Sequence, residues 1–250
     1  MQRKYKYNYR KNTHDSRDFK LELPKVESLP SSVDLRSKDV PILDQGERGT
    51  CTAFSSSCAL MYALHREKDL IFIPSENFIY YNTVANINHE DPESDPGADI
   101  RTTCKSISKY KVCAVDSWPY DDKHFGIKPN AVAYNSAKQH KSFKYMAVNQ
   151  TLKDIKTALF HGYPVLAGIQ VYESFESDEV AKSGIVPMPK PNEQCLGAHA
   201  VTIIGYTSDH FILQNSWSSS WGQHGYFTLP HSYVLDPNLT CDLYAIEIFY

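Results

Sequence analysis

Residues 45–51 read Gln-Gly-Glu-Arg-Gly-Thr-Cys and stand directly before a long apolar stretch. From Cys51 onward, apolar side chains recur at helical spacing, at Phe54, Cys58, Leu60, Met61 and Leu64. This pattern predicts a buried helix that begins at Cys51, with Thr50 as a candidate N-cap. The free N–H groups and the dipole of a helix N-terminus stabilise a thiolate, so Cys51 is a candidate nucleophile. A lone cysteine at a helix start is more often structural, and the hypothesis therefore depends on partners elsewhere in the chain.

Two side chains further along supply the partners that a cysteine nucleophile needs. His199 lies in Gly-Ala-His-Ala-Val and follows Cys51 by 199 − 51 = 148 residues, a spacing typical of one class of cysteine-nucleophile enzymes. Asn215 lies in Gln-Asn-Ser-Trp, with a second tryptophan at Trp221. Alone, the histidine and the tryptophans would be interpreted as core residues. Together with Cys51 they form the nucleophile, base and orienting group that covalent acyl transfer requires.

Gln45 adds a fourth element to this set. Its side-chain amide stands six residues before Cys51. An N–H group at that point can donate to a developing oxyanion, beside the backbone N–H of Cys51. The sequence therefore predicts a complete site for attack on a carbonyl carbon.

From about residue 29 to residue 250 the chain resembles the papain family (cathepsin-like, C1 family) of cysteine peptidases. The resemblance rests on Val33-Asp34-Leu35-Arg36, residues 45–54, Pro74-Ser75-Glu76-Asn77, Trp118-Pro119-Tyr120, residues 197–201, and Asn215-Ser216-Trp217 with Trp221-Gly222. It implies an α+β fold with a helical left lobe, a barrel-like right lobe and a cleft between them. It also implies peptide-bond hydrolysis through an acyl-enzyme, with Cys51 as nucleophile, His199 as base, Asn215 as its orienter and Gln45 as oxyanion donor.

The resemblance also implies a set of substrate-binding positions. Gly97 would hydrogen-bond the substrate backbone, Ala98, Gly197 and Ile246 would shape the main specificity pocket, and Trp217 would lie beside the cleft. The floor of that pocket is then apolar. A shift of one residue would place Glu247 there instead and favour arginine at that subsite, and the sequence does not decide the register.

The chain departs from the family pattern in ways that keep every catalytic atom. Thr52 stands where an aromatic residue is usual, Arg48 replaces a cysteine and so removes one common disulfide, and Ser218 replaces a glycine. Residues 172–175 and 227–230 resemble the microbial and large-virus branch of the family more than the lysosomal cathepsins.

Six cysteines are too few for a disulfide scaffold, and an odd number remains if one of them is the nucleophile. Cys195 and Cys241 fall near the positions of a second family disulfide, and the sequence leaves open whether they pair. The other three cysteines are interpreted as small buried apolar groups.

Residues 1–28 mix Lys, Arg, Tyr and Asn without a sustained period, which predicts an extended arm. The peptidase domain is expected over residues 29–250, with the left lobe at about 37–122 and the right lobe at about 123–250. The arm is too short for a separately folded pro-domain. Two alternatives remain: a disordered tail, or a short prosegment that lies along the cleft of a zymogen, where its basic residues would pair with the acidic loop at residues 90–95. That loop by itself is interpreted as solvated, with a subsite that selects basic substrates as the alternative.

Helical patterns occupy the first half of the chain and strand patterns the second, which predicts an α+β protein. After the helix at Cys51, helices are expected at residues 75–82 and 100–110. Strands are expected at residues 164–171, 200–204, 211–214, 226–229 and 243–249, which are rich in β-branched and aromatic residues.

Composition excludes several classes of function. A formal net charge of −3 provides no basic field for nucleic acid, and no apolar run is long enough to span a membrane. The first ten residues lack the apolar stretch of a secretory signal, so a cytoplasmic location or packaging in a particle is expected. No metal-ligand spacing occurs, and no cofactor is expected.

Peptide or protein substrates are the expected partners, and endopeptidase action is the default because no insertion resembles an occluding loop. Two alternatives use the same fold. One is a catalytically silent relative that binds peptides. The other is an acyl transferase or peptide ligase that passes the acyl group from the same cysteine to an amine.

Overall fold

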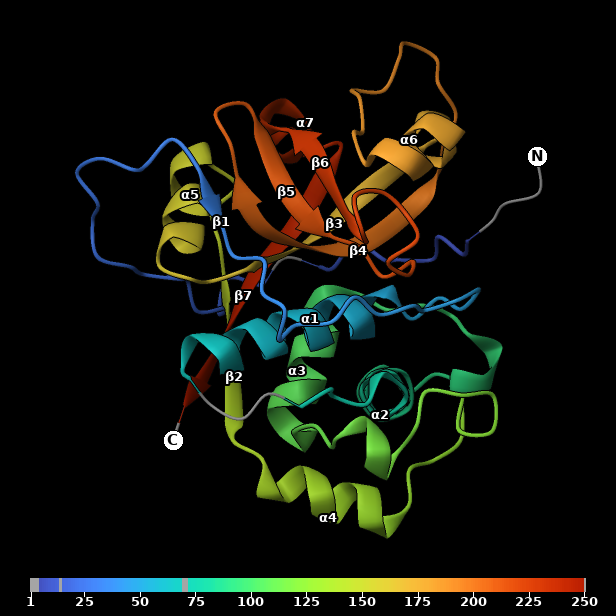
Figure 1. The fold of residues 1–250 in the computed structure, drawn as a ribbon. Helices are drawn as coiled ribbons and strands as arrows, with labels where there is room; N and C mark the ends of the chain where they lie inside the picture. The colour runs from blue at the N-terminus through green and yellow to red at the C-terminus, as the bar shows by residue number, and fades with distance from the viewer. Residues whose placement is uncertain (1–4, 14, 69–71, 250) are drawn as a thin grey trace.

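The computed structural model describes residues 5–13, 15–68 and 72–249. Helices α1 to α4 gather in one lobe and a strongly twisted sheet forms most of the other, with α5, α6 and α7 on its flanks (Figure 1). This arrangement confirms the predicted α+β fold with two lobes. Within the described ranges, no helix is long and apolar enough to cross a membrane.

Helix α1 (Cys51–Arg66) is the central element of the helical lobe. Every side chain from Cys51 to Leu64 is buried, because the helix packs on α2 and α3 on one side and on strands of the sheet on the other. The helix begins at the predicted residue. Thr50 occupies the predicted N-cap position, but its hydroxyl makes no capping hydrogen bond and lies 2.8 Å from the Tyr120 hydroxyl instead.

The other two predicted helices are also confirmed. Helix α2 (Glu76–Tyr81) is capped by Ser75, whose hydroxyl accepts from the Phe78 N–H, and it continues as a π-helical turn, η1 (Asn82–Ile87). Helix α3 (Ile100–Tyr110) is capped in the same way by Asp99. Short 3-10 turns lie before and after α3, at η2 (Pro92–Ser94) and η3 (Val115–Ser117) respectively.

Helix α4 (Ala131–Gln139) corrects the expected boundary between the lobes. Its Ala133 and Ala137 pack in one apolar cluster with Phe78 of α2 and with Trp118. In Figure 1 this helix lies with α2 and α3, away from the sheet. The helical lobe therefore extends beyond residue 122, the limit expected from the sequence.

The sheet lobe is built on seven strands in the order β2-β7-β3-β4-β5-β6, with β1 paired to β4, and every pairing between them is antiparallel. The strands are β1 (Val33–Asp34), β2 (Ser142–Ala147), β3 (Val165–Tyr172), β4 (Cys195–Tyr206), β5 (His210–Gln214), β6 (Tyr226–Pro230) and β7 (Thr240–Phe249). The flanking helices are α5 (Leu152–Phe160), α6 (Asp178–Ser183) and α7 (His231–Leu235), with a 3-10 turn, η4 (Glu173–Glu176), between β3 and α6. All five predicted strands are present, and β4 and β7 are longer than expected.

The N-terminal arm is extended, as predicted, but it is packed. Residues 5–10 run between the lobes and hydrogen-bond both, through Ala98 on one side and Ala198 on the other (Figure 1). Further on, the Leu21 N–H donates to the Ala147 carbonyl at 2.9 Å. The expectation that packed structure begins near residue 29 is therefore wrong.

Candidate active site

Cys51 occupies the first position of α1 and is fully buried. It belongs to the same apolar cluster as Ala200 of β4. The two elements are joined one turn further on, where the Thr202 hydroxyl donates to the Ser55 carbonyl at 3.0 Å. Packing of α1 on β4 thus brings the N-terminus of the helix against the strand that carries His199.

His199 and Asn215 form the hydrogen bond that the sequence predicts. His199 Nε2 lies 2.9 Å from Asn215 Oδ1. The same oxygen accepts the backbone N–H of Ser216 at 2.8 Å, which identifies this atom as the amide oxygen and therefore Nε2 as a donor. In that tautomer the lone pair lies on Nδ1, and Nδ1 has no hydrogen-bond partner among the described residues. It is the ring nitrogen that remains to accept a proton.

Trp217 covers the imidazole. Its ring stacks on His199, with centroids 4.9 Å apart and planes inclined by 24°. Trp221 and Phe175 pack edge-on behind Trp217 and hold it in place. The aromatic cluster excludes water from the hydrogen bond between His199 and Asn215, which strengthens that bond in a medium of low dielectric constant.

Burial keeps the cysteine and the histidine uncharged in this structure. It raises the pKa of the Cys51 thiol to about 12, and it lowers the pKa of His199 to about 4 against the opposing effect of the Asn215 hydrogen bond. Burial disfavours the charged form of each group, so both shifts oppose ionisation while the arm lies in the cleft.

Gln45 lies beneath the same site and is almost fully buried. Its Oε1 accepts from the Ser216 hydroxyl at 2.6 Å, and its Nε2 donates to the Arg48 carbonyl at 2.8 Å. The backbone N–H of Gln45 also donates to the Ser216 carbonyl at 2.9 Å. Nε2 carries two hydrogens, and the bond to Arg48 uses one of them.

The arm follows the predicted substrate-binding positions. The Arg10 N–H donates to the Ala98 carbonyl at 3.0 Å, and its guanidinium donates to the Gly97 carbonyl at 3.1 Å. A Cβ atom at Gly97 would lie 2.0 Å from the Asn8 carbonyl oxygen, and one at Gly197 would lie 2.6 Å from Tyr7. Both glycines are therefore needed for the close approach of an extended chain.

Trp217 and Ile246, the other two predicted substrate-binding residues, also lie against the arm. Tyr5 stacks on Trp217 at a centroid distance of 4.0 Å. Ile246 is buried in the same apolar cluster as Tyr9. Glu247, the alternative to Ile246, pairs instead with Lys144 at 2.5 Å and accepts from the Tyr163 hydroxyl at 2.8 Å.

The acidic loop pairs with the arm at two points. Lys6 Nζ lies 2.7 Å from Asp95 Oδ2, and the Arg10 guanidinium makes two hydrogen bonds of 2.8 Å to Glu90. Asp95 also accepts the Gly49 N–H at 3.0 Å and the Tyr80 hydroxyl at 2.7 Å, so it ties the turn before Cys51 to the loop. The interpretation of this loop as merely solvated is wrong for Glu90 and Asp95.

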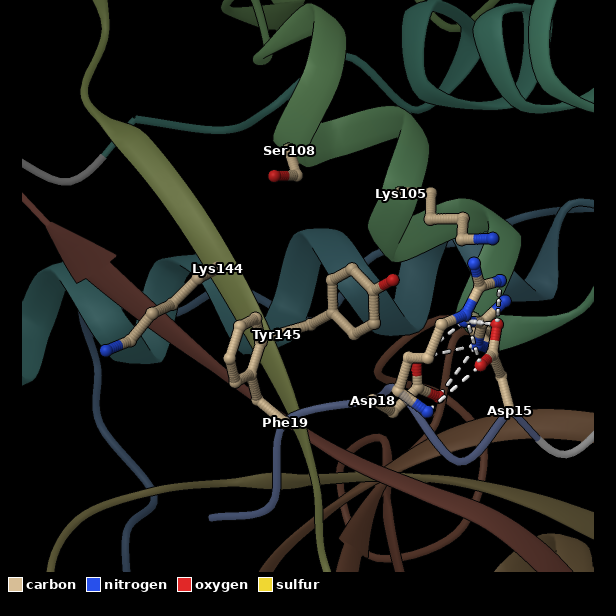
Figure 2. A pocket seen from close by; sticks show the side chains of 9 residues that line it. Asp15, Asp18, Phe19, Lys105, Ser108, Lys144 and Tyr145 are labelled. Atoms are coloured by element: carbon tan, nitrogen blue, oxygen red, sulfur yellow. Dashed lines mark hydrogen bonds and ion pairs between the residues drawn. The ribbon is translucent and has the colours of Figure 1, made fainter. Parts of the chain in front are cut away.

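A second cluster of charges anchors the arm outside the cleft. Arg101 of α3 lies 2.6 Å from Asp15 and 2.7 Å from Asp18, and the Tyr244 hydroxyl also donates to Asp18 at 2.9 Å. Figure 2 shows both carboxylates beside the pocket in which this cluster lies, with Lys105 at its edge. The arm is therefore held both within the cleft and beyond it.

The disulfide considered between Cys195 and Cys241 is absent, and both thiols are free. The strand register explains why: Cys195 lies opposite Tyr172 of β3, whereas Cys241 lies opposite Gly168 of the same strand. Four residues of an extended strand separate those two positions, which is more than a disulfide can span.

Two residues beside the cleft were missed from the sequence. The ring of Tyr9 lies over Gly168, where a Cβ atom would come within 2.2 Å of Tyr9 Cε1, and the Tyr9 hydroxyl donates to Asp242 at 2.5 Å. Gly168 can be recognised from the sequence, because a glycine inside an apolar strand often marks the close approach of another chain segment. No sequence pattern identifies Asp242, since only the pairing of β7 with β3 brings it to the cleft.

Comparison with known proteins agrees with this geometry. A family model described as papain family cysteine protease matches residues 29–243. A peptidase C1-like protein of Acanthamoeba polyphaga mimivirus is 40% identical over 238 residues, which cover 91% of this chain and 74% of the viral protein. Chicken cathepsin K is 29% identical over 210 residues, covering 80% of this chain and 58% of the cathepsin.

Solved structures show the same fold. Xylellain, a cysteine protease from Xylella fastidiosa, superposes with a TM-score of 0.90 at 31% identity and covers 100% of this chain and 99% of its own. Digestive procathepsin L 3 of Tenebrio molitor matches with a TM-score of 0.72 at 19% identity, over 94% of this chain and 75% of its own. The viral and bacterial matches confirm the predicted resemblance to the microbial and large-virus branch. The chain belongs to the papain family and is a papain-like cysteine peptidase.

Proposed function

We propose that this peptidase cleaves peptide bonds through an acyl-enzyme on Cys51. The Cys51 proton passes to His199 Nδ1, and the thiolate attacks the carbonyl carbon. Gln45 Nε2 and the backbone N–H of Cys51 stabilise the oxyanion. The imidazolium then protonates the leaving amine, and water, activated by the same histidine, hydrolyses the thioester.

The hydrogen bond between His199 and Asn215 carries this proposal. It fixes the ring so that the basic nitrogen is Nδ1, which has no hydrogen-bond partner among the described residues. A histidine that served only the core would be expected to use both of its ring nitrogens, because an unpaired buried polar atom lowers stability. Asn215 thus acts as a positioning residue that holds the base in its active tautomer.

Endopeptidase action is favoured by the length of chain that the cleft holds. The arm lies extended from Tyr5, on Trp217, to Arg10, on Glu90, and its backbone bonds to both lobes along the way. A cleft that accommodates six consecutive residues has no need of a chain terminus at either end of the substrate.

We also propose that residues 5–12 inhibit the enzyme as a short prosegment. Tyr5 and Tyr7 contact Trp217, Tyr9 fills a pocket, and Arg10 uses the backbone acceptors of Gly97 and Ala98. A substrate needs the same surfaces, so the arm and the substrate compete. The arm also keeps water out of the cleft, and without water the Cys51 thiolate and the His199 imidazolium are poorly stabilised.

The test is hydrolysis of fluorogenic peptides by the full-length chain and by a chain with Tyr5, Tyr9 and Arg10 all changed to alanine, called here the released chain. Substitution is preferable to deletion, because residues 15–23 also support the fold through Arg101 and Ala147. We expect the released chain to hydrolyse peptides faster than the unaltered chain, and Cys51→Ser and His199→Ala versions of it to be inactive.

Product analysis by mass spectrometry separates the possible outcomes. Internal cleavage with incorporation of water supports an endopeptidase, whereas transfer to an added amine would instead indicate a ligase. Binding of peptides without cleavage by a folded released chain would indicate a catalytically silent relative.

A further inference from the structure

Tyr9 of the arm fills a pocket between β3, β4 and β7. Its side chain is only 6% exposed, and it packs in one apolar cluster with Leu166, Ala200 and Tyr244. Gly168 forms the wall under the ring, and any larger residue there would occupy the space of the phenol. The pocket is therefore shaped for a flat side chain of the length of tyrosine or phenylalanine.

Asp242 introduces a carboxylate at the far end of this pocket. One of its oxygens accepts from the Tyr9 hydroxyl at 2.5 Å, from the Asn12 N–H at 2.9 Å and from the Cys241 thiol at 3.4 Å. The first two donors belong to the arm. When the arm leaves, the thiol, a weak donor, is the one that remains among the described residues.

The vacated pocket then holds a partly buried carboxylate without a strong donor. A substrate side chain that ends in a hydroxyl restores the lost hydrogen bond, whereas one that ends in a C–H group leaves the carboxylate desolvated and unpaired. Sites with a buried acceptor discriminate strongly against ligands that lack the matching donor, and far more than apolar pockets discriminate by size.

We infer that Asp242 is a specificity-determining residue, which makes this pocket select tyrosine over phenylalanine in the substrate. The arm shows the mode of binding, since Tyr9 places its ring on Gly168 and its hydroxyl on Asp242. This inference rests on the proposed peptidase activity and on displacement of the arm by substrate.

The backbone at Asp242 allows a clean test. Its φ angle is +59°, in the left-handed region that glycine and asparagine adopt readily. Asp242→Gly removes the acceptor, and Asp242→Asn keeps a neutral acceptor of the same shape. Both substitutions suit the local conformation, so the pair separates the loss of the carboxylate from a change in folding.

The experiment uses the full-length released chain and pairs of fluorogenic peptides that differ only in Tyr or Phe, at each of four positions before the cleaved bond. At one position we expect kcat/KM for Tyr to exceed that for Phe about 10-fold or more. Asp242→Gly should reduce the ratio to near one while hydrolysis of the Phe peptide continues. Asp242→Asn should give an intermediate ratio.

The basal activity of the full-length chain, measured with the arm in place, tests the inference independently. Tyr9→Phe removes only the hydroxyl, and it should raise basal activity several-fold. The same substitution should have no further effect in an Asp242→Gly background, because the two groups act through one hydrogen bond.

Two failures can be told apart. Equal rates for Tyr and Phe peptides at all four positions, or a ratio that Asp242→Gly leaves intact, would overturn the inference while the peptidase activity stands. A folded released chain that hydrolyses no peptide would instead refute the proposed function, and the inference with it.

Discussion

Tyr5 lies face to face on Trp217, with ring centroids 4.0 Å apart and planes inclined by only 3°. Trp217 also stacks on His199, so the indole contacts both the phenol and the imidazole. Burial raises the pKa of Tyr5 to about 12. One side chain of the arm thus stacks on the indole that covers His199.

Loss of the Tyr5 ring should activate the enzyme. In full-length Tyr5→Ala the arm loses its stacking contact, which is worth about 1 kcal/mol beyond the buried area, and peptide hydrolysis should rise several-fold. Phe19→Ala is the matched control, because Phe19 is an aromatic residue of the arm that is 77% exposed. Equal rates for the unaltered chain and Tyr5→Ala would argue against an inhibitory arm.

The pairing of Arg10 with Glu90 should make inhibition depend on salt. Both side chains are more than a third exposed, so their attraction is modest and is screened by ions. Basal hydrolysis by the unaltered chain should increase with NaCl concentration, and Glu90→Gln should raise the low-salt rate about 2- to 5-fold and flatten that dependence. Glu67→Gln serves as control, because it removes an ion-pair partner of Arg66, which belongs to α1 and not to the arm. The same salt profile in both variants would contradict the role of this ion pair.

Removal of the Asn215 amide should reduce catalysis more than it reduces stability. Asn215→Ala in the released chain frees the imidazole to rotate and to change tautomer, and kcat should fall on the order of 10²-fold. The control is Gln214→Ala, which removes a neighbouring buried amide that bonds Tyr62 instead of His199. Thermal unfolding should show similar destabilisation of both variants, whereas only Asn215→Ala should lose kcat. Equal kcat in the two would refute the positioning role.

Glu76 should make stability fall as the pH rises toward neutrality. It is buried at the start of α2 beside Ser57, and burial raises its pKa from 4.5 to about 7. Between these two values the folded chain binds a proton that the unfolded chain has released, so the free energy of unfolding declines with increasing pH, by about 3 kcal/mol in total. This contribution is fully present below pH 4.5 and is lost as the pH passes about 7.

Glu76→Gln keeps the hydrogen bond to Ser57 and removes the titration. Urea unfolding at several pH values between 4.5 and 8 should show a flatter profile for the variant than for the unaltered chain. Parallel profiles would show that Glu76 titrates normally in the folded protein.

Much of the site could be predicted from the sequence, because its residues lie in local patterns that do not depend on long-range packing. Helical periodicity located the start of α1, and the motifs around His199 and Asn215 named the two side chains that the structure joins at 2.9 Å. The pairing of the arm with the acidic loop could also be predicted, since the sequence shows opposite charges on the two segments.

The features that were missed depend on tertiary context. Thr50 has the residue type of a cap, but Tyr120 engages its hydroxyl. Strand β2 carries Lys144 and Tyr145 on partly exposed faces and gave no strand pattern; its pairing with β7 determines its structure. Asp242 reaches the pocket only through the irregular register of β3 and β7, which no local pattern encodes.

The proposed nucleophile and the inhibitory arm are tested most directly by intact-mass labelling with a thiol-reactive epoxide peptidyl inhibitor. The unaltered chain, the released chain and the released chain with Cys51→Ala would be compared between about pH 4 and pH 8, a range that covers ordinary carboxyl and imidazole pKa values. One adduct is expected, formed rapidly on the released chain, slowly on the unaltered chain and not at all on Cys51→Ala. A folded released chain that gains no adduct, or an adduct that persists in Cys51→Ala on a thiol such as the exposed Cys195, would contradict this expectation.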